Sequence, residues 1–168
     1  MKKLFLLSTL LIFGFSAYTE ADNHTSNSPV TDAGVLIGGV RWATRNVDAP
    51  GTFTKNPEDA GKFFQWNKRQ GWAITGDVVG WDRTPATGAE WERVNNPCPP
   101  NWRVPTMEEL TALRDAGSEW VTINDVNGRR FGSGENSLFL PAIANRNVNG
   151  TSIRSLTGTD EDNGIGIN

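Results

Sequence analysis

The chain has 168 residues and a formal net charge of −3, so it is long enough for one globular domain with additional segments. The mildly negative charge excludes the broad basic surface with which proteins bind nucleic acid. Hydrophobic residues make up 37% of the chain, which allows a core of modest size, and 18 glycines with 9 prolines predict many turns and few long helices.

Residues 1–21 have the pattern of a secretory signal peptide. Lys2 and Lys3 precede an apolar run that ends near Ala17, and a short basic start followed by such a run is typical of these peptides. Cleavage after Ala21 fits the small residues that the cleavage site requires. The run is too short to span a bilayer comfortably, so we expect an exported mature chain without a transmembrane span. The alternative is an N-terminal anchor helix.

Residues 22–33 follow as a short polar segment without periodicity, which predicts a flexible leader. The folded domain is expected to begin at Gly34. His24, the only histidine of the chain, lies in this leader. A mechanism that needs a histidine base in the folded domain is therefore not expected.

The first part of the domain contains two predicted elements. Residues 35–47 hold two short apolar runs around Gly38 and Gly39, which predicts a hairpin or a bulged strand pair. Residues 56–72 begin with a proline and two acidic residues and continue into an aromatic run. This pattern suits either a first helical turn or a junction between a turn and a strand.

Seven tryptophans are an unusual number for a chain of this size. Five of them are expected in the core or at its margin, because they lie in or beside apolar stretches; these are Trp42, Trp66, Trp91, Trp102 and Trp120. Trp72 and Trp81 are placed in a predicted loop, residues 71–88, among Gly, Asp and Thr. Their rings either stack on sugars or partner surfaces or cover the core beneath the loop, and both remain candidate binding residues.

A helix is predicted to begin after Thr106. Thr106 is a favourable N-cap and Glu109 follows three residues later, which is the pattern of a capping box. Leu110 and Leu113 give the helix one apolar face, and Gly117 suits the position just beyond its C-terminal end.

Four stretches of the chain together resemble one bacterial family: GVRWATRNVDAPGTF, NPEDAGKFFQWNK, WERVNNPCPPNWRVPTMEEL and NGRRF…NSLFLPA. In this order they are similar to the Fibrobacter succinogenes major paralogous domain, which occurs in secreted and surface proteins of Fibrobacter and Bacteroidetes. The resemblance covers about residues 34–150. It implies an α+β domain at residues 34–154 with a C-type lectin-like or formylglycine-generating-enzyme-like fold, which has short strands, one or two short helices and long loops. It also implies a Gram-negative host, with the protein secreted or held at the outer surface.

The chain departs from this family after residue 154. Residues 155–168 form a polar tail rich in Gly and Asp, whereas the family continues with a Trp-Ser-Ser segment and closing strands that carry a second cysteine. The resemblance would pair Cys98 with that cysteine, so Cys98 is expected to be half of a disulfide whose partner is missing. The expectation is a truncated copy with an open sheet edge. The alternative is a shorter natural variant that closes its core differently.

No catalytic residue, metal site or cofactor is expected. The acidic run at residues 160–163 lacks the spacing of a calcium-binding EF-hand loop. Cys98 has no nearby histidine to activate it, and the neighbouring Glu108 and Glu109 point apart if they lie on a helix. The sequence therefore predicts a protein that is not an enzyme.

The function expected from these features is that of an exported, non-catalytic binding or adhesion module. Its partner would be a polysaccharide or a cell-surface protein. The signal peptide, the lectin-like resemblance and the loop tryptophans support this hypothesis. The alternatives are a structural envelope display protein without a ligand and, with the least support, a secreted glycan-active hydrolase.

Overall fold

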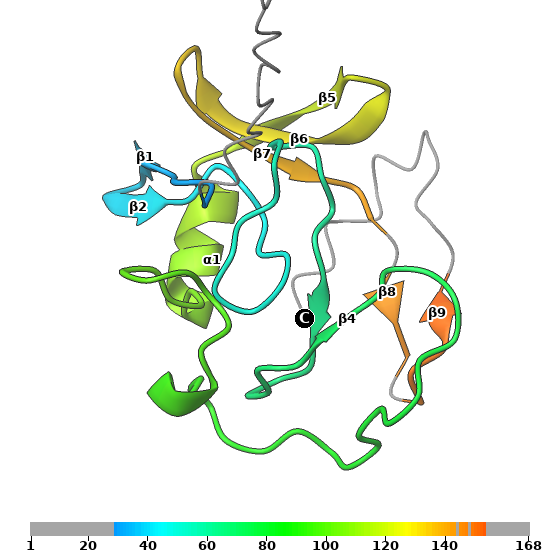
Figure 1. Ribbon diagram of the computed structural model, residues 1–168. Helices are drawn as coiled ribbons and strands as arrows, with labels where there is room; N and C mark the ends of the chain where they lie inside the picture. Colours follow the sequence, from blue (N-terminus) through cyan, green and yellow to red (C-terminus); the bar gives the residue numbers. More distant parts are fainter. Residues whose placement is uncertain (1–28, 144, 148, 154–168) are drawn as a thin grey trace, which may run out of the picture.

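The computed structural model describes residues 29–143, 145–147 and 149–153, and their architecture is a mixture of small antiparallel sheets and one α-helix (Figure 1). The elements in chain order are β1 (Val35–Ile37), β2 (Val40–Trp42), β3 (Phe63–Phe64), β4 (Gly71–Trp72), the 3-10 helix η1 (Arg93–Asn95), α1 (Met107–Asp115), β5 (Ser118–Ile123), β6 (Val126–Ser133), β7 (Asn136–Pro141), β8 (Asn145–Arg146) and β9 (Ser152–Ile153). The expected α+β class is confirmed. The predicted signal peptide, residues 22–28 of the leader and the predicted tail lie outside the described residues.

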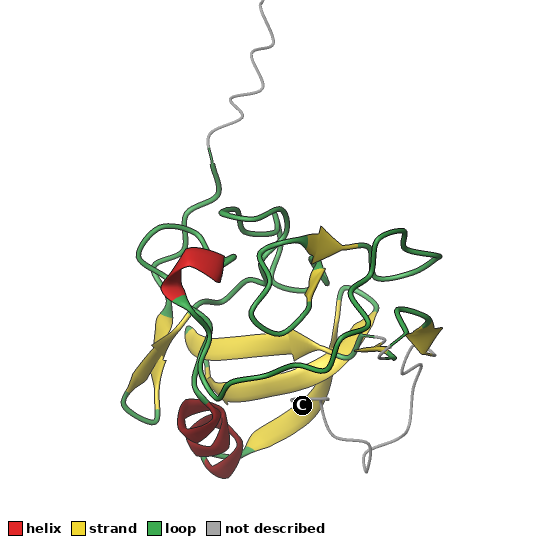
Figure 2. Ribbon diagram, turned by 90° about the horizontal axis from the view of Figure 1, so that it is seen from below, coloured by secondary structure: helices red, strands yellow, loops and turns green. Residues whose placement is uncertain are grey.

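The three strands β5, β6 and β7 form the largest sheet, in that order (Figure 2). The β1–β2 hairpin and the β8–β9 hairpin lie toward opposite sides of the molecule, with this sheet between them. Gly128 in β6 allows the ring of Phe139 in β7 to lie across it, because a Cβ atom there would be 2.5 Å from that ring. Phe139 is thereby 5% exposed.

The predicted hairpin at the start of the domain is confirmed. Gly38 and Gly39 form its two-residue turn with positive φ angles of 58° and 81°, a conformation that glycine adopts readily. Ile37 pairs with Val40 on either side of the turn. The alternation along the two strands buries Val35, Ile37 and Trp42 on one face and leaves the opposite face exposed.

The helix α1 begins and ends as its sequence predicts. The hydroxyl of Thr106 accepts a hydrogen bond from the backbone N–H of Glu109 at 3.3 Å, and the backbone N–H of Thr106 donates to the Glu109 carboxylate at 2.9 Å. Both halves of the capping box are therefore present. Gly117 follows the helix in the left-handed conformation, with φ of 81°.

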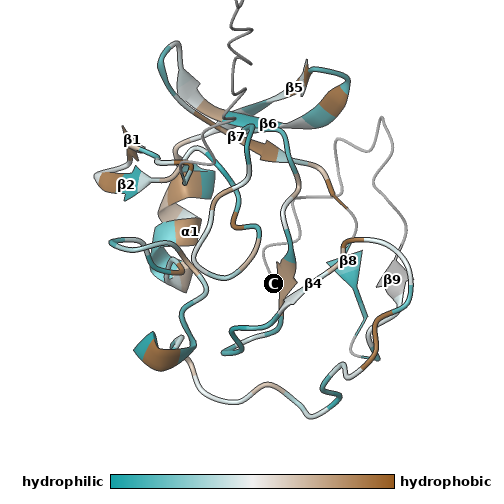
Figure 3. Cartoon of the chain, in the orientation of Figure 1, coloured by the Kyte–Doolittle hydropathy of each residue, from teal (hydrophilic) through white to brown (hydrophobic). Residues whose placement is uncertain are grey.

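The core lies where α1 meets the β1–β2 hairpin and the inner strands of the large sheet. Leu113 of α1 is 1% exposed and packs among residues of these elements. The buried cluster consists of Val35, Ile37, Trp42, Leu113, Phe131 and Leu138. Figure 3 shows hydrophobic residues on α1 and on the neighbouring hairpin. Within the described part of the chain, no helix has the length and apolar character needed to cross a membrane.

Hydrogen-bonded structure extends into the predicted leader as far as Asp32. The side chain of Asp32 is 1% exposed. Its carboxylate accepts hydrogen bonds from the backbone N–H of Gly34, from the backbone N–H of Thr44 and from the Thr44 hydroxyl, at 2.8–2.9 Å. A buried carboxylate that is satisfied in this way fixes the chain on both sides of it.

The structure decides between the two alternatives that the sequence left open for the aromatic segment. The residues from Asn56 form a turn, and β3 then pairs with β4, so a turn–strand junction is present rather than a helix. Trp72 lies in β4 rather than in the predicted loop of residues 71–88, and it is 8% exposed. The expected burial of Trp66 is wrong, because it is 37% exposed.

The capping box provides a test of how the helix is held. We expect Thr106→Ala to lower the free energy of unfolding by about 1 kcal/mol, because the N–H of Glu109 loses its acceptor. Thr106→Ser keeps the hydroxyl and is expected to change stability by only a few tenths of that value. Urea unfolding followed by circular dichroism measures both variants, and equal losses would contradict the role of the hydroxyl.

Candidate functional site

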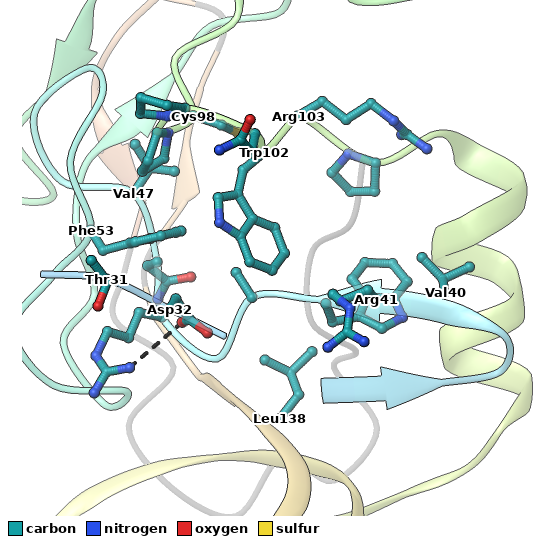
Figure 4. A pocket seen from close by; sticks show the side chains of 18 of the residues that line it. Thr31, Asp32, Val40, Arg41, Val47, Phe53, Cys98, Trp102, Arg103 and Leu138 are labelled. Atoms are coloured by element: carbon teal, nitrogen blue, oxygen red, sulfur yellow. Dashed lines mark ion pairs between the residues drawn. The ribbon is translucent and has the colours of Figure 1, made fainter. Parts of the chain in front are cut away.

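The described residues form an open groove of about 1180 Å³, called the groove below. It lies between residues 29–32, the hairpin strand β2, the loop of residues 98–105, α1 and β7. Figure 4 shows Phe53, Trp102, Leu138 and Arg41 around it. Its volume is at or above the upper end of that of ordinary small-molecule pockets, about 300–1,000 Å³, so it suits an extended ligand.

The floor of the groove is continuous with the core. Trp42, Leu113 and Leu138 belong to the buried cluster and also line the groove. Phe53 and Trp102 add an edge-to-face aromatic pair with ring centroids 5.9 Å apart. The accessible apolar surface of the groove comes from the partly buried Val40, Leu110 and Leu140, which pack on this cluster.

One wall of the groove is the free edge of β2. Residues 39–43 line the groove, whereas no residue of β1 does. Among the described residues, β2 pairs with β1 alone. In a two-residue hairpin the residues flanking the turn form the hydrogen-bonded pair, which places the backbone N–H and C=O of Arg41 on the edge away from β1. Unpaired backbone groups thus lie beside the apolar floor.

The opposite wall is a loop held by Asn96. The Asn96 side chain accepts a hydrogen bond from the backbone N–H of Cys98 at 3.2 Å and donates one to the carbonyl of Trp102 at 2.8 Å. The carbonyl of Pro97 accepts from the backbone N–H of Gly51 at 2.8 Å. These bonds close the loop on itself and tie it to the neighbouring turn, so the prolines and Asn96 give this wall a fixed shape.

Cys98 lines the groove and is half-buried, and it is the only cysteine of the chain. It therefore has no partner for a disulfide within this chain. Loss of hydration by burial raises the pKa of its thiol to about 11. At neutral pH the thiol is protonated, and a protonated thiol is a poor nucleophile.

The carboxylates at the groove are already engaged. Asp32 forms an ion pair with Arg45 at 3.6 Å in addition to its hydrogen bonds, as the dashed line in Figure 4 marks. Glu109 is bonded by Arg103 and by the backbone N–H of Thr106, and these bonds, the Arg103 bond foremost, lower its pKa. Arg41 donates to the carbonyl of Ala33 at 3.1 Å, and no carboxylate of the described residues pairs with it.

A second, smaller concavity of about 210 Å³ lies beside Trp66 and is called the recess below. It is lined mostly by polar side chains: Gln65, Asn67, Lys68, Asp82, Thr84, Thr87 and Asn95 line it with Trp66, Pro85 and Ala86. The Gln65 side chain donates to the carbonyl of Asp82 at 2.6 Å and accepts from its backbone N–H at 3.2 Å. This pair of bonds joins two segments that are 17 residues apart.

Asp82 carries the strongest electrostatic perturbation at the recess. Its carboxylate accepts hydrogen bonds from the hydroxyl and the backbone N–H of Thr84, at 2.7 and 2.9 Å, and pairs with Lys68 at 3.1 Å. The bonds from Thr84 and then that from Lys68 lower the pKa of Asp82 to about 2. The carboxylate and the ammonium group therefore neutralise one another at ordinary pH.

Trp72 and Trp81 form a pair with ring centroids 5.6 Å apart, and neither ring lines the groove or the recess. Trp81 is half-buried and lies against Gly150, where a Cβ atom would be 2.7 Å from its ring. The sequence left open whether these two rings stack on a ligand or cover the core. The burial of Trp72 favours covering the core. Sequence reasoning missed Trp66, although its flanking Gln65 and Asn67 are polar.

Within the described residues, no group of three or more His, Cys, Asp or Glu side chains is placed to hold a metal ion. Comparison of the chain with protein-family models, with curated proteins and with solved structures finds no match.

The thiol of Cys98 gives a direct test of burial in the groove wall. We expect iodoacetamide to alkylate the native protein at pH 7 on the order of 100-fold more slowly than the urea-unfolded chain, whose thiol has a pKa of about 8.5. The native rate should rise with pH until it levels off near pH 11. A native rate that levels off near pH 8.5 would contradict the buried position.

Proposed function

We propose that this protein is an exported, non-catalytic binding module that holds an extended segment of a cell-surface protein in the groove. The observation that carries this proposal is the free edge of β2 beside an apolar floor. An extended peptide can add to such an edge through backbone hydrogen bonds, while alternate side chains enter the hydrophobic surface next to it. The groove offers both kinds of contact.

The electrostatics of the groove support a partner with an acidic residue. Arg41 projects from the edge strand and lacks a carboxylate partner among the described residues. Asp32 and Glu109 are already paired with arginines. An acidic side chain near Arg41 would therefore gain a charge-assisted contact without competing for those pairs.

The state of the titratable groups supports binding rather than turnover. A general base works best with a pKa near the operating pH, whereas hydrogen bonds lower the pKa of Glu109. A nucleophilic cysteine requires a thiolate, whereas burial raises the pKa of Cys98. These perturbations run against the direction that catalysis by either group would need.

We further propose that the domain is a member of the Fibrobacter succinogenes major paralogous family with a C-type lectin-like fold. The small sheets, the helix α1 and the Asn96–Trp102 loop are compatible with what the resemblance implies. Export rests on the signal-peptide pattern of residues 1–21. A display protein without a ligand is the alternative that the following experiment separates.

The proposal is tested by selecting ten-residue peptides from a displayed random library on the mature protein and measuring their affinity by calorimetry. We expect extended, apolar peptides with an acidic residue. Arg41→Pro removes the backbone N–H at the free edge, and we expect it to weaken binding tenfold or more. Arg41→Ala removes the same side chain, keeps the N–H and serves as the matched control, with a smaller loss expected.

Bound peptide should also protect Cys98 from alkylation, because Cys98 lines the groove. Both variants must first show the cooperative unfolding of the parent protein. Failure to select any peptide, or equal losses in the two Arg41 variants, would contradict pairing at the edge of β2. The first of these outcomes would favour the display protein.

A further inference from the structure

We infer that the recess beside Trp66 is a binding site for one neutral sugar residue of a polysaccharide. This site is separate from the groove, and the two share no lining residue. It combines a fixed, partly exposed aromatic ring with polar side chains whose charges cancel.

The Trp66 ring is held in place while part of it stays open. Its indole N–H donates to the carbonyl of Thr87 at 3.2 Å, and the ring of Trp91 meets it edge-on with centroids 5.5 Å apart. The residue is nevertheless 37% exposed. A ring fixed in this manner loses little conformational entropy when it stacks against the C–H face of a sugar.

The amides beside the ring are positioned before any ligand binds. Asn67, in the left-handed conformation with φ of 54°, accepts hydrogen bonds from the backbone N–H of Glu92 at 2.9 Å and from the Asn95 amide at 3.1 Å. The remaining amide groups, Nδ2 of Asn67 and Oδ1 of Asn95, have no hydrogen-bond partner among the described residues. They supply one donor and one acceptor, which suits a sugar hydroxyl because it both donates and accepts.

The charge balance of the recess favours a neutral ligand. Lys68 and Asp82 form an ion pair at 3.1 Å, and the lowered pKa of Asp82 keeps its carboxylate ionised at ordinary pH. A phosphate or a uronic acid would have to compete with Asp82 for Lys68 and would be repelled by the carboxylate. A neutral hydroxylated ring meets neither obstacle.

The size of the recess limits what enters it. Its volume of about 210 Å³ is below the 300–1,000 Å³ that is usual for drug-sized ligands. We therefore assign it one sugar ring, at the end of a chain or at an exposed position along it. Weak binding at one such site becomes strong when many copies of a protein meet one polysaccharide surface.

The site is tested by titrating protein labelled with ¹⁵N at its tryptophan indoles with cellohexaose, xylohexaose and mannohexaose in turn. We expect at least one of them to shift the indole signals of Trp66 and Trp91 and to leave that of Trp120 unchanged. Trp66→Ala should raise the Kd at least tenfold, and Trp66→Phe should retain part of the affinity. Trp120→Ala removes a half-buried indole outside both concavities and should leave the Kd unchanged.

Three outcomes would overturn the inference. The first is that none of the three saccharides shifts the Trp66 signal. The second is an equal effect of Trp66→Ala and Trp120→Ala on the Kd. The third is tighter binding of hexagalacturonate than of every neutral hexasaccharide, because it would contradict the charge argument. Arg41→Pro should leave the saccharide titration unchanged, so failure at the groove and failure at the recess are distinguishable.

Discussion

The burial of Leu113 is the interaction on which the rest of this structure depends. Its side chain is 1% exposed and brings α1 against the β1–β2 hairpin and against Phe131 and Leu138 of the large sheet. A two-stranded hairpin is marginally stable by itself, so β1 and β2 need this packing to hold their position. The capping box adds to it by fixing where the helix begins. Removal of the Leu113 side chain would leave a cavity in the cluster that these elements share.

The same packing makes the groove, because Trp42, Leu113 and Leu138 serve the core on one side and the groove on the other. The apolar surface that stays open in the groove comes from partly buried neighbours of this cluster, Val40, Leu110 and Leu140. Such surface forgoes the roughly 25 cal/mol per Å² that burial would contribute. A peptide that covers it would recover part of that free energy and would also satisfy the edge of β2. The recess has a different support, since Asn67 and Gln65 hold it through bonds between loop segments. Two sites with independent supports can therefore take ligands of different chemistry.

Local signals in the sequence predicted the elements whose causes are local. Gly38 and Gly39 predicted the hairpin turn, and the spacing of Thr106 and Glu109 predicted the start of the helix. The exposure of Trp66 and Trp72 could not be predicted in that manner, because it depends on contacts with residues distant along the chain. The pairing of β3 with β4 buries one, and contacts with Trp91 and Thr87, more than 20 residues away, fix the other at the surface. Burial of Asp32 likewise depends on Thr44, 12 residues further along.

The most direct test of this account is native-state hydrogen exchange on Leu113→Ala, with its free energy of unfolding measured in urea. The account predicts a loss of about 2–5 kcal/mol, as for other buried leucines. It also predicts that amides of α1, the β1–β2 hairpin and β7 lose protection together, since all of them contribute to the buried cluster around Leu113. A loss below about 0.5 kcal/mol, or a loss of protection confined to α1, would contradict the claim that Leu113 holds the walls of the groove in place.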